Sequence, residues 1–173
     1  MPNPVENFAS KAVGTVKSAK AAIEGLSGVF RKLAQEHGEV SALLVRVKHS
    51  SDPEVRSTLF AEIKQQLLAH EKAELKAVYP VLMEHVDTQQ IAARHHQEAA
   101  DLEQMIVELD ALSVRDASWQ ARFAALADTV QRHAAEEEQQ FFPRAERVLG
   151  EGVASALLPR YEAAKAEIAA QLS

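Results

Sequence analysis

The chain has 173 residues and a formal net charge of −6, so it suits one domain and offers no basic field for binding nucleic acid. It contains no cysteine, which excludes disulfides, thiolate zinc sites and iron–sulfur ligation by this chain. Any metal must therefore be held by nitrogen and oxygen ligands. Glycine and proline number six each, and helix formers dominate the rest, which predicts an all-α fold.

The first 27 residues predict an amphipathic leader helix. Val5, Phe8 and Val16 have broadly helical spacing, and Gly25 and Gly28 then break the pattern. This segment lacks the uninterrupted apolar core of a signal peptide, and no stretch of the chain approaches the roughly 18 apolar residues of a membrane span. We therefore expect a cytoplasmic protein without a membrane span.

Four long helices are predicted after the leader, and two of them have clear start signals. Asp52-Pro53-Glu54 offers an N-cap, a proline at the first helical position and an acid in the first turn. Asp87 followed by Gln90 resembles a capping box. The four helices are expected at about residues 28–48, 53–85, 87–113 and 116–150.

A proline interrupts the second of these helices and also the last helix of the chain. Pro80 is expected to kink or end the second helix, and a helix over residues 153–172 should be interrupted or restarted at Pro159. Long helices with short joints indicate an up-down-up-down four-helix bundle over residues 28–150. Residues 1–27 would add a helix at one end, and residues 151–173 a helix packed on the bundle.

One motif occurs twice, at corresponding places in two of the predicted helices. Each copy has a histidine, a glutamate at +4, an aromatic residue at +9 and a proline at +10. The copies are His70, Glu74, Tyr79 and Pro80, and then His133, Glu137, Phe142 and Pro143. The chain therefore looks like two related pairs of helices.

Each His-x-x-x-Glu motif places two metal ligands on one helix face. Positions i and i+4 lie one turn apart, so the imidazole and the carboxylate can reach a common ion. Each motif also has a histidine on the preceding helix, His37 for the first and His96 for the second. Four imidazoles and two carboxylates from four helices would suit two metal ions with bridging carboxylates. The candidate ligands are His37, His70, Glu74, His96, His133 and Glu137.

Two of these assignments have rivals. His95 lies nearer the centre of the apolar stripe on the third helix, whereas His96 reproduces the spacing found after the first-helix histidine, and we prefer His96. Glu138 is the main rival of Glu137, although at +5 it is less well placed for the motif. Glu136 and Glu138 otherwise belong to a solvated face.

At these residues the sequence resembles the hemerythrin-like, or HHE cation-binding, family, over roughly residues 28–148. The matching pattern is a histidine, a His-x-x-x-Glu motif, a second histidine and a second such motif. The resemblance implies a four-helix bundle around a non-haem di-iron centre, with terminal histidines and bridging carboxylates. Manganese or zinc would also fit such ligands.

The sequence departs from oxygen-carrying hemerythrins on the third helix. Those proteins have His-x-x-x-His there, but the residues at +4 from His95 and His96 are Ala99 and Ala100. A missing histidine implies a more open coordination site. This favours sensing or redox chemistry of oxygen, peroxide or nitric oxide over simple oxygen carriage.

Three functions follow as hypotheses. The leading one is a di-iron protein that binds, senses or reduces a small diatomic or peroxide ligand, served by a redox partner. The second is an iron or zinc storage bundle, or one that its metal stabilises, without redox turnover. The third is a peroxidase-like or oxidase-like enzyme, with Tyr79 as a redox-active neighbour of the metals.

Overall fold

The computed structural model describes residue 23 and residues 25–172, so the predicted leader helix over residues 1–27 lies largely outside the described residues. Every regular element of the described chain is helical, which confirms the all-α prediction. The elements are α2 (Gly28–His49), α3 (Pro53–Ala77), α4 (Tyr79–Met83), α5 (Gln89–Asp110), α6 (Ala117–Glu136), the π-helix η1 (Glu137–Phe141), α7 (Phe142–Leu149) and α8 (Glu151–Leu172).

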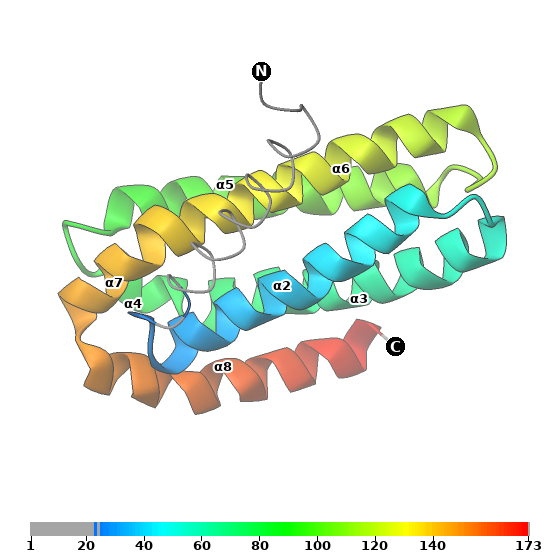
Figure 1. Ribbon diagram of the computed structural model, residues 1–173. Helices are drawn as coiled ribbons and strands as arrows, with labels where there is room; N and C mark the ends of the chain where they lie inside the picture. The colour runs from blue at the N-terminus through cyan, green and yellow to red at the C-terminus, as the bar shows by residue number, and fades with distance from the viewer. Residues whose placement is uncertain (1–22, 24, 173) are drawn as a thin grey trace, which may run out of the picture.

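The long helices lie side by side (Figure 1). Helix α2 packs against α3 and α6, and α5 packs against the same two helices. Helix α8 runs along α2 and α3 and so adds a fifth long helix to their outer side. An up-down-up-down order for the other four, and the division at residues 28 and 151, stay predictions.

One predicted helix start is confirmed and the other is wrong. Asp52 accepts a hydrogen bond from the backbone N–H of Glu54 at 2.9 Å, with Pro53 in the first turn of α3. Helix α5 instead begins after Thr88, without a side-chain cap. The Thr88 hydroxyl donates to the carbonyl of Leu82 at 2.6 Å, so it stabilises the turn after α4. The residues after Asp87 therefore form no capping box.

Pro80 and Pro143 each lie at a helix start, whereas Pro159 lies inside a helix. Helix α3 ends at Ala77 and the chain restarts as α4 with Pro80 in its first turn. In the second copy of the motif, the π-helix η1 separates α6 from α7, and Pro143 lies in the first turn of α7. A π-helical turn accommodates an extra residue and often occurs at functional sites. Helix α8 is continuous, so the predicted interruption at Pro159 is wrong.

Two apolar clusters flank a band of buried polar residues. On α2 the first cluster ends at Ala34 and the second begins at Val40; on the fourth long helix the second cluster ends at Val130 and the first resumes at Phe141. Glu36 and His37 lie between these limits on α2, and His133 and Glu137 lie between them on the fourth long helix. The fold therefore surrounds the polar band with apolar packing on two sides.

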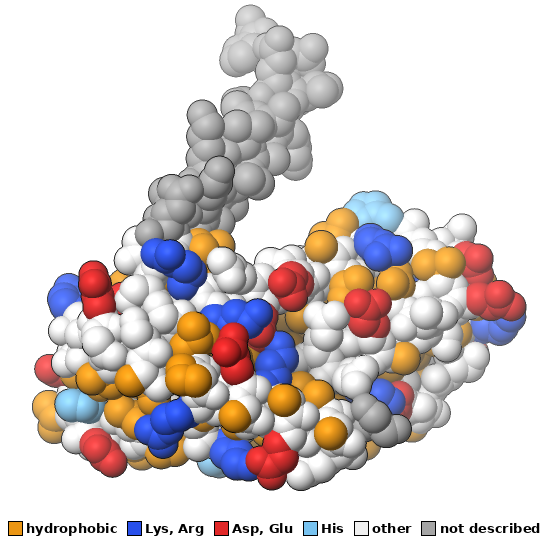
Figure 2. Space-filling view, turned by 90° about the horizontal axis from the view of Figure 1, so that it is seen from below, with side chains coloured by type: hydrophobic (Ala, Val, Ile, Leu, Met, Phe, Trp, Pro, Cys, Tyr) orange, Lys and Arg blue, Asp and Glu red, His pale blue; other side chains and the backbone are white. Residues whose placement is uncertain are grey.

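Figure 2 shows basic and acidic side chains interspersed among apolar ones on the side viewed there. Within the part of the chain that the structure describes, no helix combines the length and apolar character that crossing a membrane requires.

Candidate metal centre

Helices α2 and α3 bring two histidines into contact at the centre of the protein. The Nε2 atoms of His37 and His70 lie 3.1 Å apart, and both side chains are buried. Two neutral imidazoles can share one proton between facing nitrogens, and a cation can bind both lone pairs instead. The pair therefore defines a point on which two ligand atoms converge.

Two carboxylates from α3 complete the first half of the site. His70, Glu71 and Glu74 are buried, and each offers a ligand atom within 4.8 Å of the others. His70 Nε2 lies 3.5 Å from Glu74 Oε2, which is longer than a normal hydrogen bond. These three side chains therefore surround a space between them without closing it through direct contacts.

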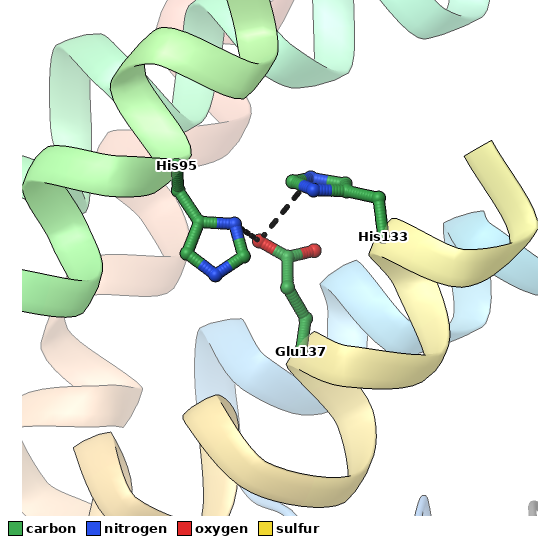
Figure 3. Close-up of side chains that lie close together, drawn as sticks. All are labelled: His95, His133 and Glu137. Atoms are coloured by element: carbon green, nitrogen blue, oxygen red, sulfur yellow. Dashed lines mark ion pairs between the residues drawn. The ribbon is translucent and has the colours of Figure 1, made fainter. Parts of the chain in front are cut away.

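The second half repeats this arrangement with residues of α5, α6 and η1 (Figure 3). His95, His133 and Glu137 are buried, and their ligand atoms also lie within 4.8 Å of one another. Glu137 Oε1 lies 3.4 Å from His95 Nδ1 and 3.5 Å from His133 Nε2. The carboxylate points at both rings, as the close-up shows.

Two carboxylates connect the halves. Glu137 Oε2 lies 3.2 Å from His37 Nε2, while its other oxygen faces the second pair of histidines. Glu71 Oε1 lies 3.5 Å from His133 Nε2, although Glu71 comes from α3. Both side chains therefore lie between the two groups of ligands, where a carboxylate can bridge two ions.

Several buried polar atoms lack the partner that burial requires. Within the described residues, both carboxylate oxygens of Glu74, both ring nitrogens of His95 and Nε2 of His133 have no hydrogen-bond partner. An unsatisfied buried polar group costs about 1–3 kcal/mol, and more when it is charged. Glu74, His95 and His133 each offer a ligand atom to one of the two groups, so the residues fit bound cations, which would satisfy those atoms.

The carboxylates of this site differ in charge. Burial raises the pKa of Glu71 to about 7, and burial with the charges of Glu137 and Glu71 raises the pKa of Glu74 well above its usual range. Burial opposes ionisation of Glu137 as well, but the charge of His133 and the hydrogen bond from His37 hold its pKa well below the usual range. In metal-free protein, Glu137 is therefore the carboxylate that stays ionised.

The histidines also differ from one another in pKa. Burial would lower the pKa of His37, but hydrogen bonds and charge from Glu137 and Glu138 raise it to about 9. Burial lowers the pKa of His70 to about 4 and also lowers that of His95. Neutral imidazole is the form that binds metals, so these two rings already have the required protonation state.

In three of the histidines, the Nδ1 atom contacts a glutamate that is not itself one of the grouped ligands. Glu138 lies 3.0 Å from Nδ1 of His37, Glu36 lies 2.9 Å from that of His70, and Glu98 lies 2.9 Å from that of His133. An imidazole that donates Nδ1–H to a carboxylate keeps Nε2 free and fixed in direction. In each case Nε2 faces the centre of the site.

The structure brings five of the six predicted ligands together: His37, His70, Glu74, His133 and Glu137. The preference for His96 as the inward residue is wrong, because His96 is exposed and His95 is buried. The apolar stripe of Ala92, Ala99 and Leu102 is the signal that points to His95.

Sequence reasoning missed Glu71, which belongs to the first group of ligands. Its signal was available, because Glu71 and Glu74 are three residues apart and share a helix face. It also placed Glu138 on a solvated face, whereas that side chain is mostly buried and contacts His37. The position of Glu138 follows from η1, whose wider turn begins at Glu137.

Together these features define a class: an all-α protein with a buried cluster of imidazoles and carboxylates suited to cations. The hemerythrin HHE cation binding domain family matches residues 22–145, and the chain belongs to that family. The matched region contains every residue of the cluster.

The chain is also similar to a longer protein. It is 25% identical over 143 residues to a protein named DNA nickase from Nostoc sp. (strain PCC 7120). The match covers 81% of this chain but 40% of the relative. No solved structure matches the chain.

Proposed function

We propose that the protein holds two iron ions and binds, senses or reduces oxygen, peroxide or nitric oxide at an open coordination position. The observation that supports this most is the convergence of buried ligand atoms without hydrogen-bond partners in two adjoining groups. The proposed ligands are His37, His70, Glu71, Glu74, His95, His133 and Glu137.

The donor set admits several metals, and the proposed redox chemistry selects iron among them. Four imidazoles with three carboxylates are borderline and hard ligands that suit iron, manganese or zinc. Bound iron would supply one-electron redox chemistry and a vacant position for a small ligand. The part of the protein is to hold the ions in an apolar setting, with Glu71 and Glu137 between them.

The side of the site next to α5 offers the room for a small ligand. A cavity of about 180 Å³ between α3 and α5 is lined by Glu71 and Ala99, by neighbouring apolar residues, and by the polar side chains of Lys72, His96 and Glu103. Ala99 follows His95 by one helical turn, where a longer side chain would fill this space. The volume exceeds that of a diatomic molecule, since a water occupies about 30 Å³.

Tyr79 fits a positioning role better than the redox role that its sequence position suggests. Its hydroxyl donates a 2.7 Å hydrogen bond to Glu137 Oε1, and the ring stacks on His95 and Phe141. Burial and the charge of Glu137 raise the pKa of Tyr79 well above its usual range, so the phenol keeps its proton. Tyr79 thus orients the carboxylate that joins the two halves.

The proposal is tested by spectroscopy on protein reconstituted with iron under anaerobic conditions. Reduced protein is mixed with oxygen, azide or nitric oxide, and the absorption spectrum is recorded. We expect new bands with at least one of these ligands, and their loss in Glu137→Ala. Iron that binds but gives no spectral change would favour the storage alternative instead. A chain that binds no iron would contradict both.

The Nostoc relative named DNA nickase raises a second candidate, metal-dependent cleavage of a DNA strand. Paired metal ions can activate water for attack on a phosphodiester. Against it, the chain has a net charge of −6, and its ligands are buried away from a strand. Incubation of metal-loaded protein with supercoiled plasmid tests it: conversion to open circles that Glu137→Ala abolishes would support nicking.

A further inference from the structure

Helix α8 contacts the metal centre through a carboxylate on α2. Glu36 is buried, and one of its oxygens, Oε2, meets three donors. The Tyr161 hydroxyl donates to it at 2.6 Å, His70 Nδ1 lies 2.9 Å away, and Lys165 Nζ lies 2.7 Å away. Tyr161 and Lys165 both belong to α8 and are four residues apart, so one face of that helix holds the carboxylate.

This contact fixes the direction of a proposed ligand. The Tyr161 hydroxyl is also 3.1 Å from Nδ1 of His70, and the two rings meet edge to face. A histidine held at Nδ1 by a carboxylate has its Nε2 aimed and its tautomer fixed, and loss of such a partner weakens metal binding about 10-fold to 100-fold. Glu36 and Tyr161 therefore contact His70 at Nδ1, whereas its Nε2 faces the site.

The other half of the site lacks an equivalent support. The carboxylate behind His133 is Glu98, whose side chain is 33% exposed and borders a cavity of about 130 Å³ between α5 and α6. Its cation partner is Arg94 at 3.4 Å, itself half exposed. By contrast, the side chain of Glu36 is only 4% exposed. The two metal positions thus have unlike surroundings.

Helix α8 lies outside residues 22–145, the part of the chain that matches the family. Its approach to α2 depends on Gly28, which has φ +50°. A Cβ atom at this position would overlap the backbone of Ala154 in α8. The sequence therefore contains a specific provision for close packing of α8 on the bundle.

We propose that α8 contributes to metal binding at this centre. Tyr161 and Lys165 act as positioning residues that hold Glu36 against His70, which makes the metal position at His70 the tighter of the two. The position at His133, with its solvent-facing carboxylate, is the weaker and more exchangeable one. This inference rests on the proposed function, because it presupposes that both positions bind a metal.

The test is a stepwise titration of full-length, metal-free protein with Zn²⁺ against a competing chromogenic chelator. Wild-type protein should bind two ions with distinct affinities. Tyr161→Phe removes one hydroxyl and should weaken the tighter step about 10-fold or more. Lys165→Met should weaken the same step. Lys76→Met is the matched control, because it breaks the exposed α3–α8 ion pair with Glu167 and leaves Glu36 untouched.

Two further variants, His133→Ala and His70→Ala, show which metal position the Tyr161→Phe substitution weakens. In His133→Ala, Tyr161→Phe should still weaken the remaining step, whereas in His70→Ala it should change nothing. Thermal melting of each metal-free variant checks folding, and Lys165→Met carries the test if Tyr161→Phe does not fold.

Wild-type affinity at both steps in Tyr161→Phe and Lys165→Met, or equal weakening of both steps, would overturn the role of α8. Wild-type protein that binds no Zn²⁺ and no iron would instead overturn the proposed function. The two failures are therefore distinguishable.

Discussion

Glu71 shows how a single buried residue can oppose stability in the absence of metal. Its pKa is raised to about 7 by burial, so above pH 7 the metal-free fold carries a charge that the unfolded chain accommodates more easily. We predict that Glu71→Gln raises the free energy of unfolding of metal-free protein at pH 8 by about 1–3 kcal/mol and lowers its iron content. Urea denaturation and metal analysis measure the two effects.

The control for this prediction is Glu62→Gln, which changes an exposed glutamate on the same helix. It should alter neither quantity. A Glu71→Gln protein that is less stable without metal, or that retains full iron content, would refute the assignment of Glu71.

His37 contributes to the pH dependence of metal-free protein, together with the buried glutamates whose pKa values are raised. Its folded pKa of about 9 lies above the ordinary value of 6.5, so its contribution is complete below pH 6.5 and is lost as pH rises through 9. We expect a loss of about 3 kcal/mol in the free energy of unfolding over that range. Urea denaturation in chelator at several pH values checks this, and His37→Gln should make the fall in stability between pH 6.5 and 9 shallower. A wild-type curve that is already flat would contradict it.

The third-helix histidine shows what residue-level reasoning could and could not predict. His95 and His96 are adjacent, and a shift of one residue turns a side chain by about 100° on a helix. Matching offsets between α2 and α5 favoured His96, but those offsets assume an equal register in both helix pairs. The apolar stripe on α5 measures burial directly and favours His95. Burial, not repetition, was the better guide.

At the scale of the elements, the helices themselves were largely predictable from the sequence. The start of α3 at Asp52-Pro53 and the end of the fourth long helix at Gly150 follow from local capping chemistry. The π-helix η1 did not follow, because the sequence carries no local signal for it; its residues Glu137 and Glu138 both contact His37. The continuity of α8 through Pro159 likewise depends on packing against α2 and α3.

Helix α8 should depend on Gly28 for its docking. Gly28→Ala is expected to lower the free energy of unfolding by at least 2 kcal/mol, because a Cβ atom there meets backbone and the φ of +50° disfavours alanine. Gly38→Ala is the matched change, since Gly38 lies inside α2 with open space around it. That variant should gain about 0.5–1 kcal/mol. Chemical denaturation of both compares them, and equal effects would contradict the close approach of α8.

For the whole molecule, stability should depend on metal. Seven proposed ligands share one buried region, and cations that bind only the folded state stabilise it by mass action. At free iron 100-fold above the dissociation constant, each site should add about 2.7 kcal/mol. Anaerobic thermal melting with and without Fe²⁺ should show an upward shift that chelator reverses. An unchanged melting temperature would argue against a resident metal.

We propose that two metal ions bind among these buried histidines and carboxylates. The most direct test is the iron content per chain after anaerobic reconstitution, measured by elemental analysis on wild-type protein, His95→Ala and His96→Ala. We expect two irons in wild-type protein and in His96→Ala, and fewer than two in His95→Ala. Wild-type protein without iron, or a loss of iron in His96→Ala but not in His95→Ala, would contradict this proposal.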